Sequence, residues 1–508
     1  MAKYDYAKLQ NGSDIRGVAL EGVAGEAVNL NGETAGRLGR GFLFWLTNMT
    51  GKPAHELTVA IGRDPRLSGE DIAKSIIDAL APHGCKVLDA GLASTPAMFM
   101  STIFEDYKCD GSIMITASHL PWNRNGMKFF DAYGGLNKGD IIDIIAFAES
   151  DSMLNSMRPI PPKEITSIPL IDTYAAHLRQ LIIEGVGAGD TPLSGMKITV
   201  DAGNGSGGFY ATKVLEPLGA DISSSQFLEP DGNFPNHAPN PEDKKAMASI
   251  CSRVTECGTD LGLIFDTDVD RSSAVDEKGQ EINRNSIVAM AAALIADAYP
   301  GTTVVTDSIT SNELTTFLEE NLGLKHLRFK RGYKNVINKS VELNEAGTDS
   351  QLAIETSGHA AYKENYFLDD GAYLATKIVI KAAQLFREGL GISSLLADLK
   401  LPAESEEIRF PILAEDFGSY GDSIIAELET LARSGQIAGA TLVEPNYEGV
   451  RIAFDRPDFS GWLLLRKSLH DPIMPLNIES NTEGGCLEIR KVLKPILAGY
   501  DQLDTSKL

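Results

Sequence analysis

Three stretches of the 508-residue chain begin alike, and this repetition limits the fold more than any other feature. Each opens with a β-rich run that ends in a polar turn, continues into a segment of helical composition, and reaches a glycine suited to a helix C-cap. The helical segments are 69–81, 208–218 and 311–322. Because strands alternate with helices, the repeat predicts largely parallel sheets with right-handed crossovers.

The fold class expected from this pattern is α/β. It comprises three similar α/β domains with mixed, mostly parallel sheets, followed by a smaller C-terminal α+β domain after Pro402, where short strands replace the repeat. The length also suits several domains rather than one core. The predicted boundaries are 1–188, 189–299, 300–403 and 404–508.

Composition excludes several classes of function. The net charge of −24 disfavours nucleic acid and anionic membranes as partners, and any phosphate site must carry its own local positive charge. Five cysteines without a CxxC pair make a disulfide framework or a zinc site unexpected. No apolar run is long enough for a membrane helix, and the first residues lack a signal-peptide core. We expect a cytoplasmic protein, or an organelle-stroma protein if a targeting segment has been removed.

Each repeat delivers a different polar loop after an apolar run, at the strand ends where ligands bind in such folds. In the second repeat, Asp266, Asp268 and Asp270 follow the run 261–265. Grouped carboxylates repel one another unless a cation neutralises them, and their hard oxygens suit Mg²⁺. The alternative is a solvated acidic turn. The preceding apolar run argues against it, because a buried strand would lead directly into these residues.

The loop of the first repeat holds Ser118, His119 and Lys128, and we interpret Ser118 as a phosphate carrier. Taken alone, this loop is equally compatible with catalysis and with a structural role. In the structural role, Ser118 caps a helix and Lys128 is a surface lysine. The third repeat ends in Glu355, Ser357 and His359, which could hold sugar hydroxyls but form a weak signal alone.

A fourth polar loop lies in the last domain, where Arg466, Ser468 and His470 follow a short strand. Arginine can bind phosphate in a bidentate manner, so this group predicts a phosphate cradle. A basic surface turn is the alternative.

Together and in this order, the four loops resemble those of the α-D-phosphohexomutase family, which includes phosphoglucomutases and phosphomannomutases. The resemblance covers almost the whole chain. Its further matches are Asp14-Ile15-Arg16-Gly17, Gly62-Arg63-Asp64-x-Arg66-x-Ser68 and Thr95-Pro96. The phosphate loop departs from the family, since Leu469-His470-Asp471-Pro472 stands where Gly-Thr-Glu-Pro is usual, and Ile354 replaces a glycine before Glu355.

The resemblance implies domains around a central cleft and a reversible phosphoryl shift between O1 and O6 of a hexose phosphate, glucose and/or mannose. Phosphorylated Ser118 would give a hexose 1,6-bisphosphate intermediate, with Mg²⁺ bound by Ser118, Asp266, Asp268 and Asp270 and with glucose 1,6-bisphosphate as activator. Arg271 and Lys128 would stabilise charge, Lys128 or His119 would move the proton, and Arg16 would join the catalytic residues. The implied substrate-binding residues are Glu355, Ser357, His359, Arg466, Ser468, His470 and, in the variable loop of the third domain, Arg331 and Gly332.

The resemblance also implies a monomer or homodimer that binds a hexose phosphate. Two alternatives remain at this point. A phosphoglucosamine mutase shares the same loop types. A non-catalytic relative that binds sugar phosphates in a regulatory role would fit the altered phosphate loop, but binding alone does not require a nucleophile such as Ser118.

Overall fold

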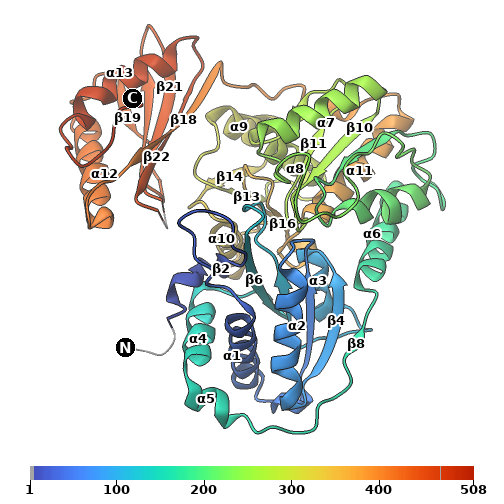
Figure 1. Ribbon diagram of the computed structural model, residues 1–508. Helices are drawn as coiled ribbons and strands as arrows, with labels where there is room; N and C mark the ends of the chain where they lie inside the picture. The colour runs from blue at the N-terminus through green and yellow to red at the C-terminus, as the bar shows by residue number, and fades with distance from the viewer. Residues whose placement is uncertain (1–4, 469–470) are drawn as a thin grey trace. The chain divides into compact units, whose positions relative to one another are not determined.

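The computed structural model describes residues 5–468 and 471–508 (Figure 1). These residues form two compact units. The first contains residues 5–295, 351–353 and 357–397, and the second contains residues 296–350, 354–356 and the described part of 398–508. Within the described ranges, no helix combines the length and apolar character needed to cross a membrane.

The first sheet of the first unit has eight strands in the order β1-β2-β6-β5-β3-β4-β8, with β7 paired to β6. The strands β5, β3, β4 and β8 pair in parallel, with Ile61 opposite Ile113, and β1, β2, β6 and β5 pair antiparallel. The strand bounds are β1 (Gln10–Asn11), β2 (Asp14–Val18), β3 (Thr58–Arg63), β4 (Lys86–Leu92), β5 (Gly111–Ile115), β6 (Arg124–Asp131), β7 (Gly134–Gly135) and β8 (Thr166–Ser167).

Six helices accompany this sheet: α1 (Gly32–Thr50), α2 (Gly69–Leu80), α3 (Thr95–Ile103), α4 (Lys138–Glu149), α5 (Asp151–Ser156) and α6 (Leu170–Val186). The helix α1 packs against both α2 and α4, which Figure 1 shows on either side of it. A Cβ on Gly41 would lie 2.5 Å from the Ile144 carbonyl oxygen, so α1 approaches α4 this closely only because position 41 has no side chain.

The second sheet of the first unit has the order β12-β11-β10-β9, in which only β9 and β10 are parallel. Its elements and the helices of this part are β9 (Ile198–Asp201), α7 (Lys244–Cys257), β10 (Leu261–Phe265), β11 (Ser272–Val275), β12 (Glu281–Ile282), α8 (Asn285–Ala296) and α11 (Gly371–Arg387). The predicted helix 208–218 becomes a π-helical segment, Tyr210–Leu215, followed by a 3-10 turn, Glu216–Leu218. Pro217 lacks an amide hydrogen, so a regular α-helix cannot continue through it.

The second unit contains a parallel pair, β13 (Thr303–Thr306) with β14 (Lys325–Arg328), and the helical segments α9 (Asn312–Thr316), Phe317–Asn321 and α10 (Tyr333–Glu345). The short strand β15 (Leu352–Ile354) is divided between the units, and β16 (Ala360–Tyr362) pairs antiparallel with β17 (Leu368–Asp369) in the first unit. Short 3-10 turns lie at Ala7–Leu9, Ala54–Glu56, Ala81–His83, Lys363–Asn365 and Ile392–Leu396.

The last part of the second unit is an antiparallel sheet with the order β18-β22-β21-β20-β19 (Figure 1). Its elements are β18 (Glu404–Pro411), α12 (Phe417–Arg433), β19 (Ala440–Leu442), β20 (Val450–Asp455), β21 (Ser460–Leu465), β22 (Ile473–Ser480) and α13 (Gly485–Leu497). Residues of both helices and of the sheet share one hydrophobic core, which includes Leu428, Leu463 and Ile489. The predicted α+β character of this segment is therefore observed.

Candidate active site

Ser118 lies in the loop between β5 and β6, at the edge of the sheet where two polar loops of the first unit meet. Its φ of 49° falls in the left-handed region, which residues other than glycine rarely adopt. The Ser118 amide donates a hydrogen bond to Thr116 Oγ1 at 2.9 Å, and the side chain is buried. An unusual backbone conformation that is held in this way is common at functional positions.

The Ser118 hydroxyl lies between opposite charges. It donates to Asp266 Oδ2 at 2.9 Å and accepts from Arg271 Nη2 at 2.7 Å, although these residues are far apart in the chain. The same Arg271 nitrogen lies 2.7 Å from His119 Nδ1. Because a guanidinium can only donate, Nδ1 of His119 is an acceptor in this state. Burial first and the Arg271 charge second lower the pKa of His119 to about 3, so the imidazole is neutral.

The three aspartates predicted to hold a metal follow β10 directly and are all buried. One carboxylate oxygen from each of Asp266, Asp268 and Asp270 lies within 4.8 Å of the others. Among the described residues, Oδ1 of Asp268 and Oδ1 of Asp270 have no hydrogen-bond partner. Burial first and the Asp270 charge second raise the pKa of Asp266 well above its usual value. Buried oxygen donors with unused capacity fit a hard divalent cation such as Mg²⁺.

Lys128 on β6 reaches the same acidic loop. Its ammonium forms a short ion pair with Asp270 and lies 3.3 Å from Asp268 Oδ2. Burial raises the pKa of Asp270, but Lys128 and then His359 outweigh burial and hold this pKa below its usual range. The predicted cation at position 128 is therefore placed against the predicted metal ligands.

His359 also belongs to this cluster. The Ser272 amide donates to the Gly358 carbonyl at 3.4 Å, which joins the loop of His359 to the strand after the acidic loop. Burial lowers the pKa of His359, but the nearby Asp369 and Asp270 carboxylates outweigh burial and raise it to about 9. The imidazole is therefore protonated at neutral pH.

The second unit gathers other predicted site residues. The Gly332 amide donates to Glu355 Oε1 at 2.6 Å, and the Arg331 amide donates to Glu448 Oε2 at 3.1 Å. Burial lowers the pKa of Arg466, and the Glu448 carboxylate opposes this effect. Glu448 was not among the predicted residues, and it lies in the segment between β19 and β20.

The remaining predicted residues are placed as follows. The Ser468 amide donates to the Ile473 carbonyl at 2.9 Å, which fixes the start of its loop. Ser357 is buried and belongs to the first unit. His470 lies outside the described residues, so its predicted role stays a prediction.

Comparison with known proteins decides the family. Models described as phosphoglucomutase/phosphomannomutase α/β/α domains I, II and III match residues 7–151, 172–279 and 283–400. The chain belongs to the phosphoglucomutase/phosphomannomutase family. The predictions of α-D-phosphohexomutase membership, of three α/β domains with mixed sheets and a smaller C-terminal domain, and of a phosphohexomutase enzyme are thereby confirmed.

Individual relatives agree with this assignment. A phosphomannomutase/phosphoglucomutase of Pseudomonas syringae pv. tomato is 30% identical over 94% of this chain and 92% of its own. A phosphoglucomutase of Neisseria gonorrhoeae is 29% identical over 88% of this chain and 89% of its own. The crystal structure of a phosphoglucomutase/phosphomannomutase family protein from Burkholderia thailandensis is 25% identical, covers 96% of each chain and superposes with a TM-score of 0.76.

In this phosphohexomutase, the sequence did not predict a role for Arg66, which shapes residues 118–124, the serine loop. The fully buried Arg66 donates from Nε to Asp64 Oδ2 at 3.2 Å. Its two terminal nitrogens donate to backbone carbonyls of the serine loop, namely those of Ser118, Leu120, Pro121 and Arg124. The predicted Arg16 acts in a similar way, since its Nη1 donates to the Thr116 carbonyl at 2.8 Å. The match of Arg66 to the family pattern was the available signal.

Asn240 was missed as well. Its side-chain oxygen accepts from Arg271 Nη1 at 3.3 Å, on the side of the guanidinium away from Ser118. Its loop is fixed by buried His237, whose Nε2 lies 3.0 Å from Asp201 Oδ2 and whose Nδ1 lies 2.9 Å from the Ala238 carbonyl. The Pro239-Asn240-Pro241 sequence indicated a rigid turn, but nothing in it indicated contact with Arg271.

Proposed function

We propose that this phosphohexomutase transfers a phosphoryl group reversibly between O1 and O6 of a hexose phosphate, with glucose and/or mannose as the sugar. Ser118 is the carrier in this proposal. The observation that carries it is the Ser118 hydroxyl, which is held between Arg271 and Asp266, a member of the acidic triad. Positioning and charge stabilisation supply most of the catalysis in phosphoryl transfer, and these are the contributions that the cluster can make.

In the first transfer, the bond between phosphorus and Ser118 Oγ breaks and a bond to a substrate hydroxyl oxygen forms, giving a hexose 1,6-bisphosphate. Arg271 balances the charge of the moving phosphoryl group, and the substrate hydroxyl loses its proton. In the second transfer, Ser118 Oγ takes the other phosphoryl group and the departing sugar oxygen regains a proton. Because Ser118 is buried and kept from water, transfer of its phosphoryl group to the sugar is favoured over hydrolysis.

The proton carrier in this proposal is Lys128. With Nδ1 of His119 accepting from Arg271, the neutral imidazole carries its proton on Nε2 and cannot accept another proton there. Lys128 is buried against the acidic loop, where burial favours the neutral amine that accepts a proton and the Asp268 and Asp270 carboxylates favour the ammonium that returns it.

The proposed metal is Mg²⁺, held by Asp266, Asp268, Asp270 and phosphorylated Ser118. When bound, it would neutralise phosphoryl oxygens and so lower the barrier to transfer. We propose Glu355, Ser357 and His359 as ligands of the sugar hydroxyls. Arg466, Ser468, His470, Arg331 and Gly332 are proposed to bind the phosphate and the remainder of the substrate.

The same proposal includes glucose 1,6-bisphosphate as activator, a cytoplasmic location (or an organelle stroma if a targeting segment has been removed), and a monomer or homodimer. It keeps four domains with the bounds 1–188, 189–299, 300–403 and 404–508. Light scattering of the purified protein measures the oligomeric state directly.

Intact mass measurement tests the carrier. We expect one phosphoryl group on Ser118, lost on treatment with a phosphatase and restored by glucose 1,6-bisphosphate. A Ser118→Ala variant should accept no phosphoryl group and lose mutase activity. The control is Ser112→Ala, because Ser112 is buried on the strand that precedes the loop and its hydroxyl donates to the Met98 carbonyl. Full activity of Ser118→Ala would refute the mechanism.

A substrate panel decides the sugar. Glucose 1-phosphate and mannose 1-phosphate should both turn over, and glucosamine 6-phosphate should turn over more slowly. A preference for glucosamine 6-phosphate would instead support a phosphoglucosamine mutase.

A further inference from the structure

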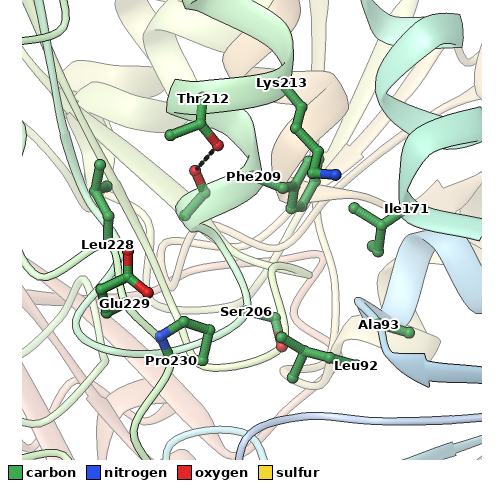
Figure 2. A pocket seen from close by; sticks show the side chains of 11 residues that line it. Leu92, Ala93, Ile171, Ser206, Phe209, Thr212, Lys213, Leu228, Glu229 and Pro230 are labelled. Carbon is green, nitrogen blue, oxygen red and sulfur yellow. Dashed lines mark hydrogen bonds between the residues drawn. The ribbon is translucent and has the colours of Figure 1, made fainter. Parts of the chain in front are cut away.

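A cavity of about 320 Å³ lies in the first unit (Figure 2). Three parts of the chain line it: the end of β4, the start of α6, and the segment around the π-helical turn with residues 228–230. None of the residues proposed to bind the hexose phosphate lines this cavity. It therefore requires a separate explanation.

The lining is mainly apolar, from Leu92, Ile171, Phe209, Leu228 and Pro230. Figure 2 shows its two charged side chains, Lys213 and Glu229, on opposite sides. Lys213 already forms an ion pair with Asp172, so an anion such as a sugar phosphate would meet no unneutralised positive charge here. The lining instead suits an uncharged molecule with an apolar body.

One polar group inside the cavity lacks a partner. Ser206 is 5% exposed and lines the cavity, and its hydroxyl has no hydrogen-bond partner among the described residues. Buried hydroxyls in folded proteins are nearly always hydrogen-bonded, so an unpaired one marks a position where a ligand or a water belongs. A ligand that carries one hydroxyl or amide group would satisfy it.

Both walls of the cavity are bonded to the acidic loop. The Ser206 amide donates to the Thr267 carbonyl at 2.7 Å. On the other wall, Leu92 and Ala93 lead into Thr95, whose amide donates to the Asp268 carbonyl at 2.8 Å and whose hydroxyl donates to the Asp268 carboxylate. A molecule that fixes these two walls also restrains the loop that presents Asp268.

We propose that this cavity binds an uncharged small molecule with an apolar body and one hydroxyl or amide group, and that this binding is coupled to cation binding by the acidic loop. The coupling is reciprocal, because linkage requires each ligand to change the affinity of the other by the same factor. Binding in the cavity is independent of the proposed function, whereas the coupling rests on the proposed Mg²⁺ site.

The test uses two probes of nearly equal size, 2-phenylethanol and ethylbenzene, which differ by a hydroxyl. Ligand-detected NMR titrations of the full chain in a chelator measure both affinities. Ser206→Ala should weaken the binding of 2-phenylethanol about fivefold and leave the binding of ethylbenzene unchanged, because only 2-phenylethanol can form a hydrogen bond with the Ser206 hydroxyl. Equal effects on both probes, or no saturable binding, would mean that Ser206 is satisfied by water alone, and this would overturn the proposal.

A blocking variant tests the location. Thr212 lines the cavity, is exposed and donates to the carbonyl four residues earlier, so Thr212→Trp should fill the entrance and weaken both probes about tenfold or more. Thr430→Trp is the matched control, since Thr430 is also exposed, helical and bonded to the carbonyl four residues earlier. Binding that survives Thr212→Trp would place the probes elsewhere and refute the cavity assignment.

Titration of Mg²⁺ with and without 2-phenylethanol tests the coupling. We expect each ligand to strengthen the other about fivefold, which is within the range of allosteric coupling. Independent binding would refute the coupling. Probe binding without any Mg²⁺ binding would support the cavity site and contradict the proposed metal site, so the two failures are distinguishable.

Discussion

Replacement of Arg66 by lysine should loosen the loop that presents Ser118, although the positive charge at position 66 is kept. Arg66 makes five side-chain hydrogen bonds, one to Asp64 and four to carbonyls of the loop 118–124. A lysine ammonium has three hydrogens and no planar fork, so at least two of the five bonds must be lost.

The size of the effect follows from this count. A hydrogen bond that involves a charged group contributes about 1.5–3 kcal/mol. The exposed end of the loop near Pro121 can recover bonds from water, so we take the lower value for two bonds and expect a loss of about 3 kcal/mol. If this loss falls on the geometry of Ser118, kcat should decrease about 150-fold, since each 1.36 kcal/mol changes a rate tenfold.

Three measurements check this expectation. Steady-state kinetics should show the loss mainly in kcat, urea unfolding should show a lower free energy of unfolding, and amide exchange in the loop 118–124 should become faster. The control is Arg63→Lys, because Arg63 is nearby but pairs with the exposed Glu70, and such surface pairs contribute little. A kcat for Arg66→Lys equal to that of Arg63→Lys, with unchanged amide exchange, would refute the role assigned to Arg66.

Three further predictions concern the first unit. Asp268→Asn should abolish stabilisation by Mg²⁺ in thermal unfolding, whereas the unchanged protein should gain about 2.7 kcal/mol when Mg²⁺ is 100 times its Kd. Asn240→Ala should reduce kcat about tenfold, because Arg271 loses the bond on the side opposite Ser118, and Asn240→Asp should restore most activity because it retains an acceptor. Burial lowers the pKa of His237, but the Asp201 carboxylate outweighs burial and raises it, so the stability contributed by this pair is present below pH 6.5 and is lost as pH rises through the folded-state pKa.

Each of these predictions has an opposing result. Undiminished Mg²⁺ stabilisation of Asp268→Asn would remove Asp268 from the metal site. Equal activity of Asn240→Ala and Asn240→Asp would show that Asn240 does not position Arg271. For the third, unfolding free energy is measured against pH for the unchanged protein and for His237→Gln. Curves that stay parallel above pH 6.5 would contradict the role of the His237–Asp201 pair.

The sequence allowed good prediction wherever a signal was local. The carboxylates of Asp266, Asp268 and Asp270 lie within five residues directly after an apolar strand, so their clustering required no knowledge of the fold. Helices such as α2 were predicted because helical composition and a following glycine lie in one short segment. The segment 208–218 was predicted as helical, but hydrogen-bond spacing within a helix depends on packing, and its π-helical form was not predicted.

By itself, the sequence determined the family, the α/β class and the loop that contains Ser118. Tertiary structure decided which side chains act on that serine. Asp266 and Arg271 contact its hydroxyl from about 150 positions away. Arg66 supports the loop and Asn240 supports the guanidinium, and although Arg66 matches a family motif, neither segment shows locally which groups its side chain bonds. The physical reason is that hydrogen bonds to backbone carbonyls and to a guanidinium are selected by distance and direction in space. Spacing along the chain does not encode either quantity once the loops belong to different sheets.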